Sequence, residues 1–242
     1  MIDKLQAFRG IDYAINSKIV IRQPTLQEIC DYGEQKYLLL IKMICSTPAD
    51  HKVEIWDAMH IYWDQMDEYE LFSISIIGVL QRLDVSILFK GIDFSTFHAS
   101  PINGSNEIRL CNKDGIIIDR SIYSLITDYL RYIHHFKKND DVGYNDLTKD
   151  IMIEDDRDEQ TLMKSKQFDS VLLPLISSLT NCSDFKYRYD DVWTMPIGAF
   201  MDSVGRIQKF HNYEHMMQGI YSGCVDMKKI NKRDLNWMGE LK

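Results

Sequence analysis

The chain has 242 residues, 45% of them hydrophobic, and a formal net charge of −8. This composition supports a folded core and excludes a globally disordered chain, while the acidic balance argues against duplex nucleic acid or a membrane surface as the main partner. No apolar run approaches the roughly 20 residues that cross a bilayer, and the N-terminus lacks the apolar segment of a signal peptide, so we expect the protein to stay in the compartment where it is made.

The cysteines are odd in number and form no CxxC pair. A disulfide framework therefore does not fit, and reduced thiols are expected. Cys30 and Cys45 fall within an apolar helical pattern, where a thiol packs like a small hydrophobic side chain. We interpret both as core residues.

A β-hairpin and a long helix are predicted at the start of the chain. Ile11, Tyr13 and Ile15 alternate with other residues before a turn at Asn16-Ser17, and the apolar run 19–21 follows the turn as the returning strand. Residues 25–47 then repeat apolar positions at helical spacing, and Thr25 with Glu28 forms the capping box that starts a helix. Because Pro48 ends the pattern, we predict one helix over 25–47.

Further helices and a second hairpin follow. Residues 48–59 predict a helix that opens at its proline, and the strongly apolar residues 70–83 favour a buried helix over a strand. In residues 107–119 a turn ending at Gly115 separates two apolar runs. That pattern predicts the second hairpin.

The second half of the chain is predicted to be helical. Residues 121–138 carry one apolar face, 146–167 are highly charged, and 169–180 are apolar. Residues 196–223 predict a long helix, and the tail 226–242 is short and amphipathic. The buried stripe of the long helix is predicted at Ala199, Phe200, Ser203, Val204, Ile207, Phe210 and Met217.

These elements predict an α+β fold that is predominantly α-helical, with two β-hairpins. We expect residues 1–242 to form a single α-rich domain. The alternative is a subdivision into a hairpin and helix part, 1–138, and a helical part, 146–242. The sequence leaves open whether the two hairpins pair into one sheet.

Two histidines are the sharpest candidates for a metal site. His211 and His215 are four residues apart, so both imidazoles would lie on one helical face. The zinc-protease pattern needs Glu directly after the first histidine, where this chain has Asn212. We therefore expect solvent-facing histidines, with no metal and no other cofactor. His134 and His135 are interpreted as terminal helix residues that the helix dipole favours.

Paired carboxylates are the other candidates for chemistry. The acidic run 154–159 lacks the central glycine of a calcium loop, so a solvated helix face is expected. The pairs Asp64/Asp67 and Asp190/Asp191 have no spacing that identifies a general acid. The chain also lacks the nucleophile-elbow, phosphate-loop and dinucleotide-binding motifs. We expect it not to be an enzyme.

Short blocks of residues, none of them a catalytic motif, run across nearly the whole chain. They are Gln23-Pro24-Thr25-Leu26, Glu28-Ile29, Tyr32-Gly33-Glu34, Thr47-Pro48-Ala49-Asp50, Glu70-Leu71-Phe72, Asp128-Tyr129-Leu130-Arg131, Val192-Trp193, Ala199-Phe200-Met201-Asp202-Ser203-Val204, Arg206-Ile207, Tyr221-Ser222-Gly223, and Asn231-Lys232 to Trp237-Met238. Together these blocks resemble a family of proteins encoded in the structural gene clusters of tailed phages and prophages of Gram-positive bacteria.

The resemblance implies a tail-morphogenesis protein and favours a tail assembly chaperone. Such a chaperone would bind the tape-measure protein or another tail protein, such as a tube subunit, in the host bacterial cytoplasm. The same gene clusters also encode virion subunits, so a tail, neck or connector component is the alternative. Neither nucleic acid nor a membrane is expected as a partner, and homo-oligomerisation is left open.

Candidate partner-binding residues lie in the C-terminal region, which is rich in methionine and aromatic residues. Adaptable methionine side chains suit variable partners, although ordinary core filling predicts the same composition. Tryptophan is a common binding hot spot, and the tail could either dock in a groove or tie down the chain end. The candidates are Met216, Met217, Leu235, Trp237 and Met238.

Overall fold

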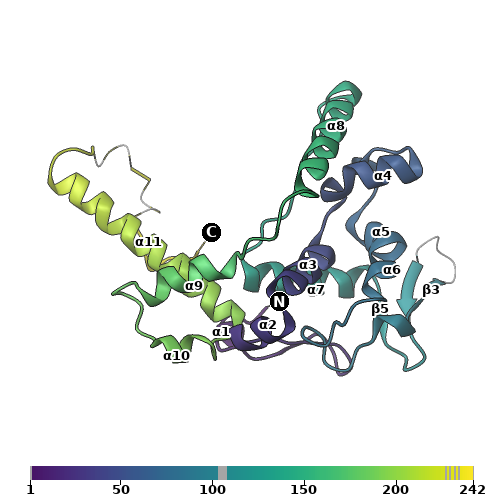
Figure 1. The fold of residues 1–242 in the computed structure, drawn as a ribbon, viewed down its shortest axis with the longest axis horizontal. Coiled ribbons are helices and arrows are strands. Elements are labelled where there is room, and N and C mark those ends of the chain that lie inside the picture. Colours follow the sequence, from purple (N-terminus) through teal and green to yellow (C-terminus); the bar gives the residue numbers. More distant parts are fainter. Residues whose placement is uncertain are drawn as a thin grey trace.

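Two helices, α8 (Asp146–Met163) and α11 (Ile197–Tyr221), project from a body built around α7 (Arg120–His134) (Figure 1). The chain is mostly helical with two small antiparallel sheets, which confirms the predicted α+β class. The computed structural model describes residues 2–102, 108–226, 228, 230, 231, 233 and 235–241.

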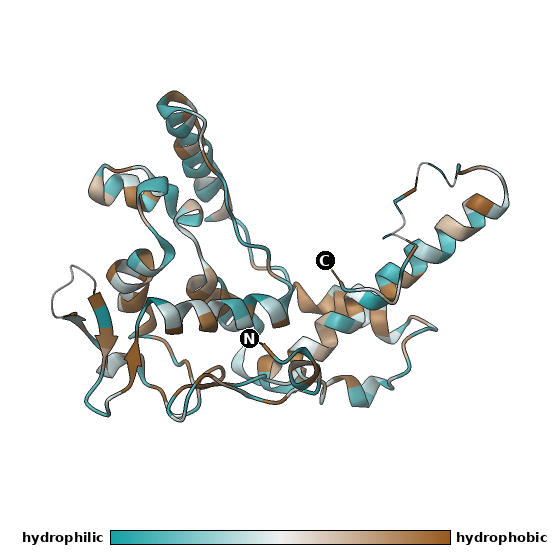
Figure 2. Ribbon diagram, turned by 180° about the vertical axis from the view of Figure 1, so that it is seen from behind, coloured by the Kyte–Doolittle hydropathy of each residue, from teal (hydrophilic) through white to brown (hydrophobic). Residues whose placement is uncertain are grey.

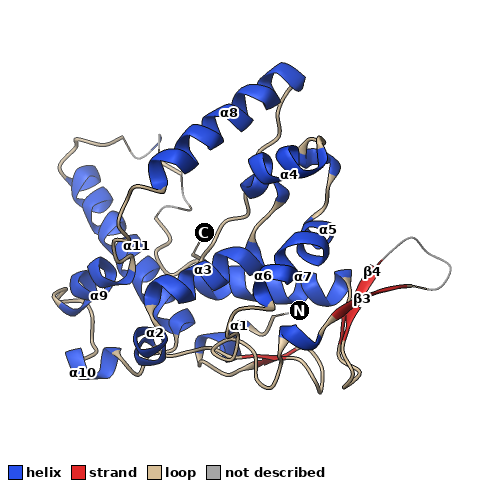
Figure 3. Ribbon diagram, turned by 45° about the vertical axis from the view of Figure 1, so that its right-hand side comes forward, coloured by secondary structure: helices blue, strands red, loops and turns tan. Residues whose placement is uncertain are grey.

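Both predicted hairpins are present, and their described strands lie in separate sheets. In the first, β1 (Tyr13–Ala14) pairs antiparallel with β2 (Val20–Ile21). In the second, the turn at Asn112 is closed by its own side chain, whose amide oxygen accepts hydrogen bonds from the backbone of Asp114 and Ile116. An additional strand extends this sheet, which has the order β3 (His98–Pro101), β4 (Ile108–Cys111), β5 (Ile117–Ile118) (Figure 3).

The helix predicted over 25–47 begins as expected but is broken in the middle. The capping box is confirmed, because the Glu28 amide donates to Thr25 Oγ1 and the Thr25 amide donates to Glu28 Oε2. However, Gly33 adopts φ 100° and divides the segment, so the prediction of one helix is wrong. The two helices are α2 (Leu26–Tyr32) and α3 (Glu34–Cys45).

The apolar segment predicted as a buried helix over 70–83 is helical but irregular. A π-helical stretch, η3 (Phe72–Ile76), connects α5 (Glu68–Leu71) to α6 (Ile77–Leu80). The proline-initiated helix is confirmed as η1 (Pro48–His51) followed by α4 (Lys52–Met59). The remaining elements are α1 (Lys4–Phe8), η2 (Trp63–Gln65), η4 (Phe94–Thr96), α9 (Leu172–Thr180) and α10 (Tyr189–Val192).

Helix α7 is the centre of the core. It packs against α3, α5, β5 and the first turns of α11. Its Tyr123 ring stacks on Phe72 with 4.4 Å between ring centroids, and the Tyr129 hydroxyl accepts a hydrogen bond from the buried Gln23 amide. The buried residues of α7 are Tyr123, Ile126, Thr127, Tyr129, Leu130, Ile133 and His134. One face of the helix is therefore fully covered.

His134 is the last residue of α7, as predicted, but it is buried in the core, so the explanation by the helix dipole is wrong. Its Nδ1 lies 2.7 Å from the Leu130 carbonyl, which can only accept, so Nδ1 carries the proton. Nε2 then accepts from the Tyr37 hydroxyl at 2.6 Å. Burial lowers the pKa of His134 to about 4, because desolvation of the charged ring outweighs the hydrogen bond to the Leu130 carbonyl, which acts in the opposite direction.

Helix α11 is tied to the body at its start. The Leu26 amide donates to the Met195 carbonyl and the Ile197 amide to the Pro24 carbonyl, which ties α11 to the beginning of α2. Its buried residues are Ile197, Gly198 and Phe200. The long buried stripe predicted for this helix is therefore wrong beyond Phe200. The later stripe residues are half-buried, since the helix projects beyond the body (Figure 1).

The cysteine interpretation is correct for one residue and wrong for the other. Cys45 is buried, whereas Cys30 is exposed on the outer side of α2. All five cysteines are free thiols. None of the helices in the described ranges has the combination of length and apolar character that a bilayer-spanning helix needs.

Candidate functional site

Exposed apolar side chains follow helix α8 and the segments on either side of it. Helix α8 is mostly hydrophilic, with separate hydrophobic residues along its length (Figure 2). Three of these, Leu147, Ile151 and Leu162, fall on one face at helical spacing, and we call them the α8 face. The exposed large apolar residues of this region are Val142, Tyr144, Leu147, Ile151, Leu162, Met163, Phe168, Val171 and Leu173.

The opposite face of α8 is polar and is turned toward the body. Lys52 of α4, whose side chain is only 5% exposed, lies with Nζ 3.1 Å from the Asp156 carboxylate. Arg157 donates to both carboxylate oxygens of Asp57, and Gln160 donates to Glu54. An ordinary surface helix does the reverse and turns its apolar side inward. In α8 only Ile153 is buried, although the whole helix is described.

The expectation of a solvated helix face for residues 154–159 is correct for part of the run. Glu154, Asp155 and Asp158 are exposed and share the side of the α8 face. Asp156 and Arg157 instead make the contacts with α4. The α8 face is therefore apolar with acidic neighbours, which suits a helix that carries an apolar stripe beside basic residues.

The predicted carboxylate pairs have structural partners. Asp64 forms an ion pair with Lys149 at 2.6 Å. Asp67 caps α5 by accepting from two backbone amides and also pairs with Arg120. Asp191 accepts from the Arg188 amide at the start of α10. These contacts account for Asp64, Asp67 and Asp191 as helix caps and surface ion pairs.

The predicted partner-binding residues divide into two groups. Trp237 folds back onto α11, where its ring lies edge-on to Phe210 with centroids 5.1 Å apart. The Arg206 guanidinium donates to the carbonyls of Trp237 and Gly239. Trp237 is half-buried, which matches the structural alternative for the tail.

The other candidates are more accessible. Met238 is 73% exposed, and Leu235 is half-buried. Met216 and Met217 are half-buried on the projecting part of α11. A cavity of about 730 Å³ lies between α11 and the C-terminal segment, with Met201, Val204, Gly205 and Leu241 among its lining residues. In the described part of the tail, residues 233, 235 and 237–238 lie in turns.

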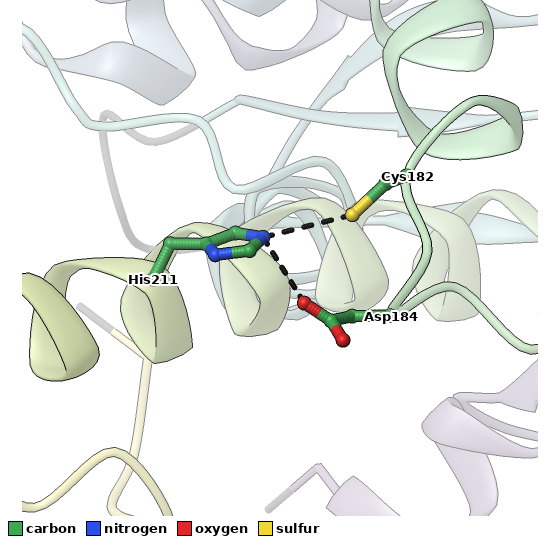
Figure 4. A group of neighbouring side chains, drawn as sticks. All are labelled: Cys182, Asp184 and His211. Atoms are coloured by element: carbon green, nitrogen blue, oxygen red, sulfur yellow. Dashed lines mark hydrogen bonds and ion pairs between the residues drawn. The ribbon is translucent and has the colours of Figure 1, made fainter.

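His211 does not converge with His215, which is exposed. It instead meets two residues of the turn that follows α9 (Figure 4). Its Nε2 lies 3.6 Å from Cys182 Sγ and 3.3 Å from Asp184 Oδ2. Each of the three residues offers one possible ligand atom, and these three atoms all lie within 4.8 Å of one another. All three residues are half-buried.

The contact between Cys182 and His211 shifts the pKa values of the two residues in opposite directions. The hydrogen bond with His211 lowers the pKa of Cys182, and the same bond raises the pKa of His211. His211 Nδ1 lies 3.6 Å from the Glu214 carboxylate, one turn along the helix. Sequence spacing could not reveal the cluster, because 29 positions separate Cys182 from His211.

The last part of the chain matches a family model. A family model described as YomV second domain matches residues 164–242. The matched part contains α9, α10, α11 and the whole cluster around His211, whereas α8 and the body lie before it. No curated protein and no solved structure shows significant similarity to the chain.

Proposed function

We propose that the protein is a non-enzymatic phage tail morphogenesis protein, and that it acts as a tail assembly chaperone in the host cytoplasm. The sequence blocks that resemble phage structural-cluster proteins support this role. The YomV second-domain match supports it further, because YomV is a Bacillus prophage-region protein. The partner is the tape-measure protein or another tail protein with apolar helices.

The observation that carries the proposal is the reversed orientation of α8. Exposed apolar patches are costly in a soluble protein and mark interaction surfaces. Helix α8 is attached through ion pairs and the buried Ile153, and it leaves Leu147, Ile151 and Leu162 mostly exposed. A helix that is held by its polar side keeps its apolar side available for a partner helix.

The charges beside the α8 face define the partner further. Glu154, Asp155 and Asp158 flank it, so a partner helix with Lys or Arg beside its apolar stripe would gain electrostatic steering during association. This acidic face fits the net charge of −8. We therefore expect binding to weaken as salt is raised, because the rim charges are screened.

Co-purification with the tape-measure protein of the same prophage tests the proposal. The wild type is expected to retain the tape-measure protein after co-expression. Ile151→Ser combined with Leu162→Ser is expected to lower the retained amount at least about tenfold, since each substitution removes apolar contact area. The matched control is Leu39→Ser with Ile74→Ser, which changes the same residue types at exposed positions of the body.

Three results bear on the proposal. Equal loss of retention in both double variants would remove the α8 face as the binding surface. Retention that is unchanged in both would have the same consequence.

Mass spectrometry of purified particles separates the two roles in phage morphogenesis: a chaperone is absent from finished virions, whereas a tail, neck or connector subunit is present in stoichiometric amounts.

A further inference from the structure

We propose that Cys182, Asp184 and His211 bind a divalent transition-metal ion, for which zinc fits best, and that the ion fastens the turn after α9 to α11. The three side chains come from two elements that the chain brings together (Figure 4). They supply one thiolate, one carboxylate oxygen and one imidazole nitrogen. This mixture of sulfur, oxygen and nitrogen ligands is typical of zinc sites.

The first argument is that two groups converge on one nitrogen. Cys182 Sγ and Asp184 Oδ2 both approach Nε2 of His211. A single ring nitrogen carries either one proton or one lone pair, so it makes one strong hydrogen bond at a time. A metal ion at the centre of the three atoms would use all of them at once.

The second argument is the spacing of the atoms. Zinc bonds of about 2.3 Å to sulfur and about 2.0–2.2 Å to nitrogen and oxygen, at tetrahedral angles, place ligand atoms about 3.4–3.6 Å apart. The observed separations are 3.6 Å for Sγ to Nε2 and 3.3 Å for Oδ2 to Nε2. The side chains therefore require little movement to accept the ion.

The third argument is the environment of the cluster. His211 Nδ1 faces Glu214, and a carboxylate at the second nitrogen commonly orients a metal-bound histidine. Cys182 follows α9 directly, so the cluster lies near the negative end of that helix dipole. Both features favour a cation beside His211.

The ion would have a structural effect on a weakly covered part of the molecule. The projecting half of α11 has no fully buried residue after Phe200, so few contacts hold it to the rest of the chain. A metal bond between positions 182 and 211 closes the loop that contains α10. Binding to the folded state alone raises stability by mass action.

Metal titration of the purified full-length chain tests the proposal. Isothermal titration with Zn²⁺ is expected to give one ion per chain, and Co²⁺ substitution is expected to give a sulfur-to-metal charge-transfer band. His211→Gln and Cys182→Ser should each weaken Zn²⁺ binding more than about 100-fold, and Glu214→Gln about 10-fold. The matched controls His215→Gln and Cys224→Ser change exposed residues of the same types and should bind like the wild type.

The outcomes separate a metal site from a metal-free ion pair. Zn²⁺ should raise the thermal midpoint of the wild type and of both controls, but not that of Cys182→Ser. Circular dichroism of each variant without metal checks that it is folded. Absence of stoichiometric binding to the wild type would overturn the proposal. So would a Co²⁺ complex without the sulfur band, or equal weakening by His215→Gln.

Discussion

Helices α7 and α8 are both amphipathic, yet they use their apolar faces in opposite ways. Helix α7 turns its apolar face into the core and exposes its polar face. Helix α8 turns charged residues toward α4 and exposes Leu147, Ile151 and Leu162. Helical spacing in the sequence predicts that a helix has an apolar face. The neighbouring elements of the fold decide whether the body or a partner covers that face.

The two helices should also differ in how firmly they are held. The contacts of α7 bury aromatic and aliphatic side chains, which supply most of the free energy of folding. Apart from the buried Ile153 and the buried Lys52 of α4, the contacts of α8 join partly exposed polar groups, and such surface pairs contribute little each. We therefore expect α8 to open locally while α7 opens only on global unfolding.

The largest expected effect comes from truncating the same residue type in each helix. Leu130 of α7 is 0% exposed, and Leu130→Ala should lower the free energy of unfolding by about 2–5 kcal/mol, because it leaves a cavity in the core. Leu162 of α8 is 64% exposed, and Leu162→Ala should change the free energy of unfolding by no more than about 0.5 kcal/mol. Urea denaturation measures both values. Equal losses in the two variants would contradict the contrast.

The next effect is an acid sensitivity that comes from the buried His134 in the core. The pKa of His134 is about 4 in the folded chain against 6.5 for a free histidine. The unfolded chain therefore takes up a proton first as the pH falls. Stability should decrease by roughly 3 kcal/mol between pH 6.5 and pH 4, with no further loss from this group below that.

Comparison with His134→Gln isolates this contribution. The variant lacks the titrating ring, so its stability should change less between pH 6.5 and pH 4. The pKa values of Glu28, Asp67 and Asp119 are lowered in the folded chain, so both proteins should lose stability from these carboxylates at lower pH. Denaturant midpoints over this pH range measure the difference. Parallel pH profiles would show that His134 is not a buried neutral group.

A smaller effect is expected at the start of α2, at the edge of the core. Thr25→Ala removes the hydroxyl that accepts from the Glu28 amide and should cost about 0.5–2 kcal/mol. Thr25→Ser keeps a hydroxyl in the same position and serves as the control. Thermal denaturation of both variants measures the loss. Identical midpoints for Thr25→Ala and the wild type would mean that the cap is dispensable.

Local signals in the sequence were sufficient for caps, turns and the face of α7. They were insufficient wherever a distant contact decides the outcome. A glycine at position 33 is compatible with a continuous helix, but the chain turns there, and Glu34 accepts from the amides of Val171 and Leu172 at the start of α9. The partner of His211 could not be predicted either, since Cys182 reaches it only in the folded chain.

The smallest effect on global stability is expected at the C-terminal segment. Trp237 contacts Phe210 on the projecting part of α11, away from the buried residues at the start of that helix. Because this part can open before the core does, Trp237→Ala should leave the global free energy of unfolding within about 0.5 kcal/mol of the wild type. Hydrogen exchange should nevertheless become faster at the amides around Phe210, since the ring no longer covers them. Met238→Ala, at the adjacent exposed position, is the control and should change neither quantity. If Trp237→Ala instead leaves exchange unchanged and lowers partner retention, Trp237 is a binding residue and does not tie the segment to α11.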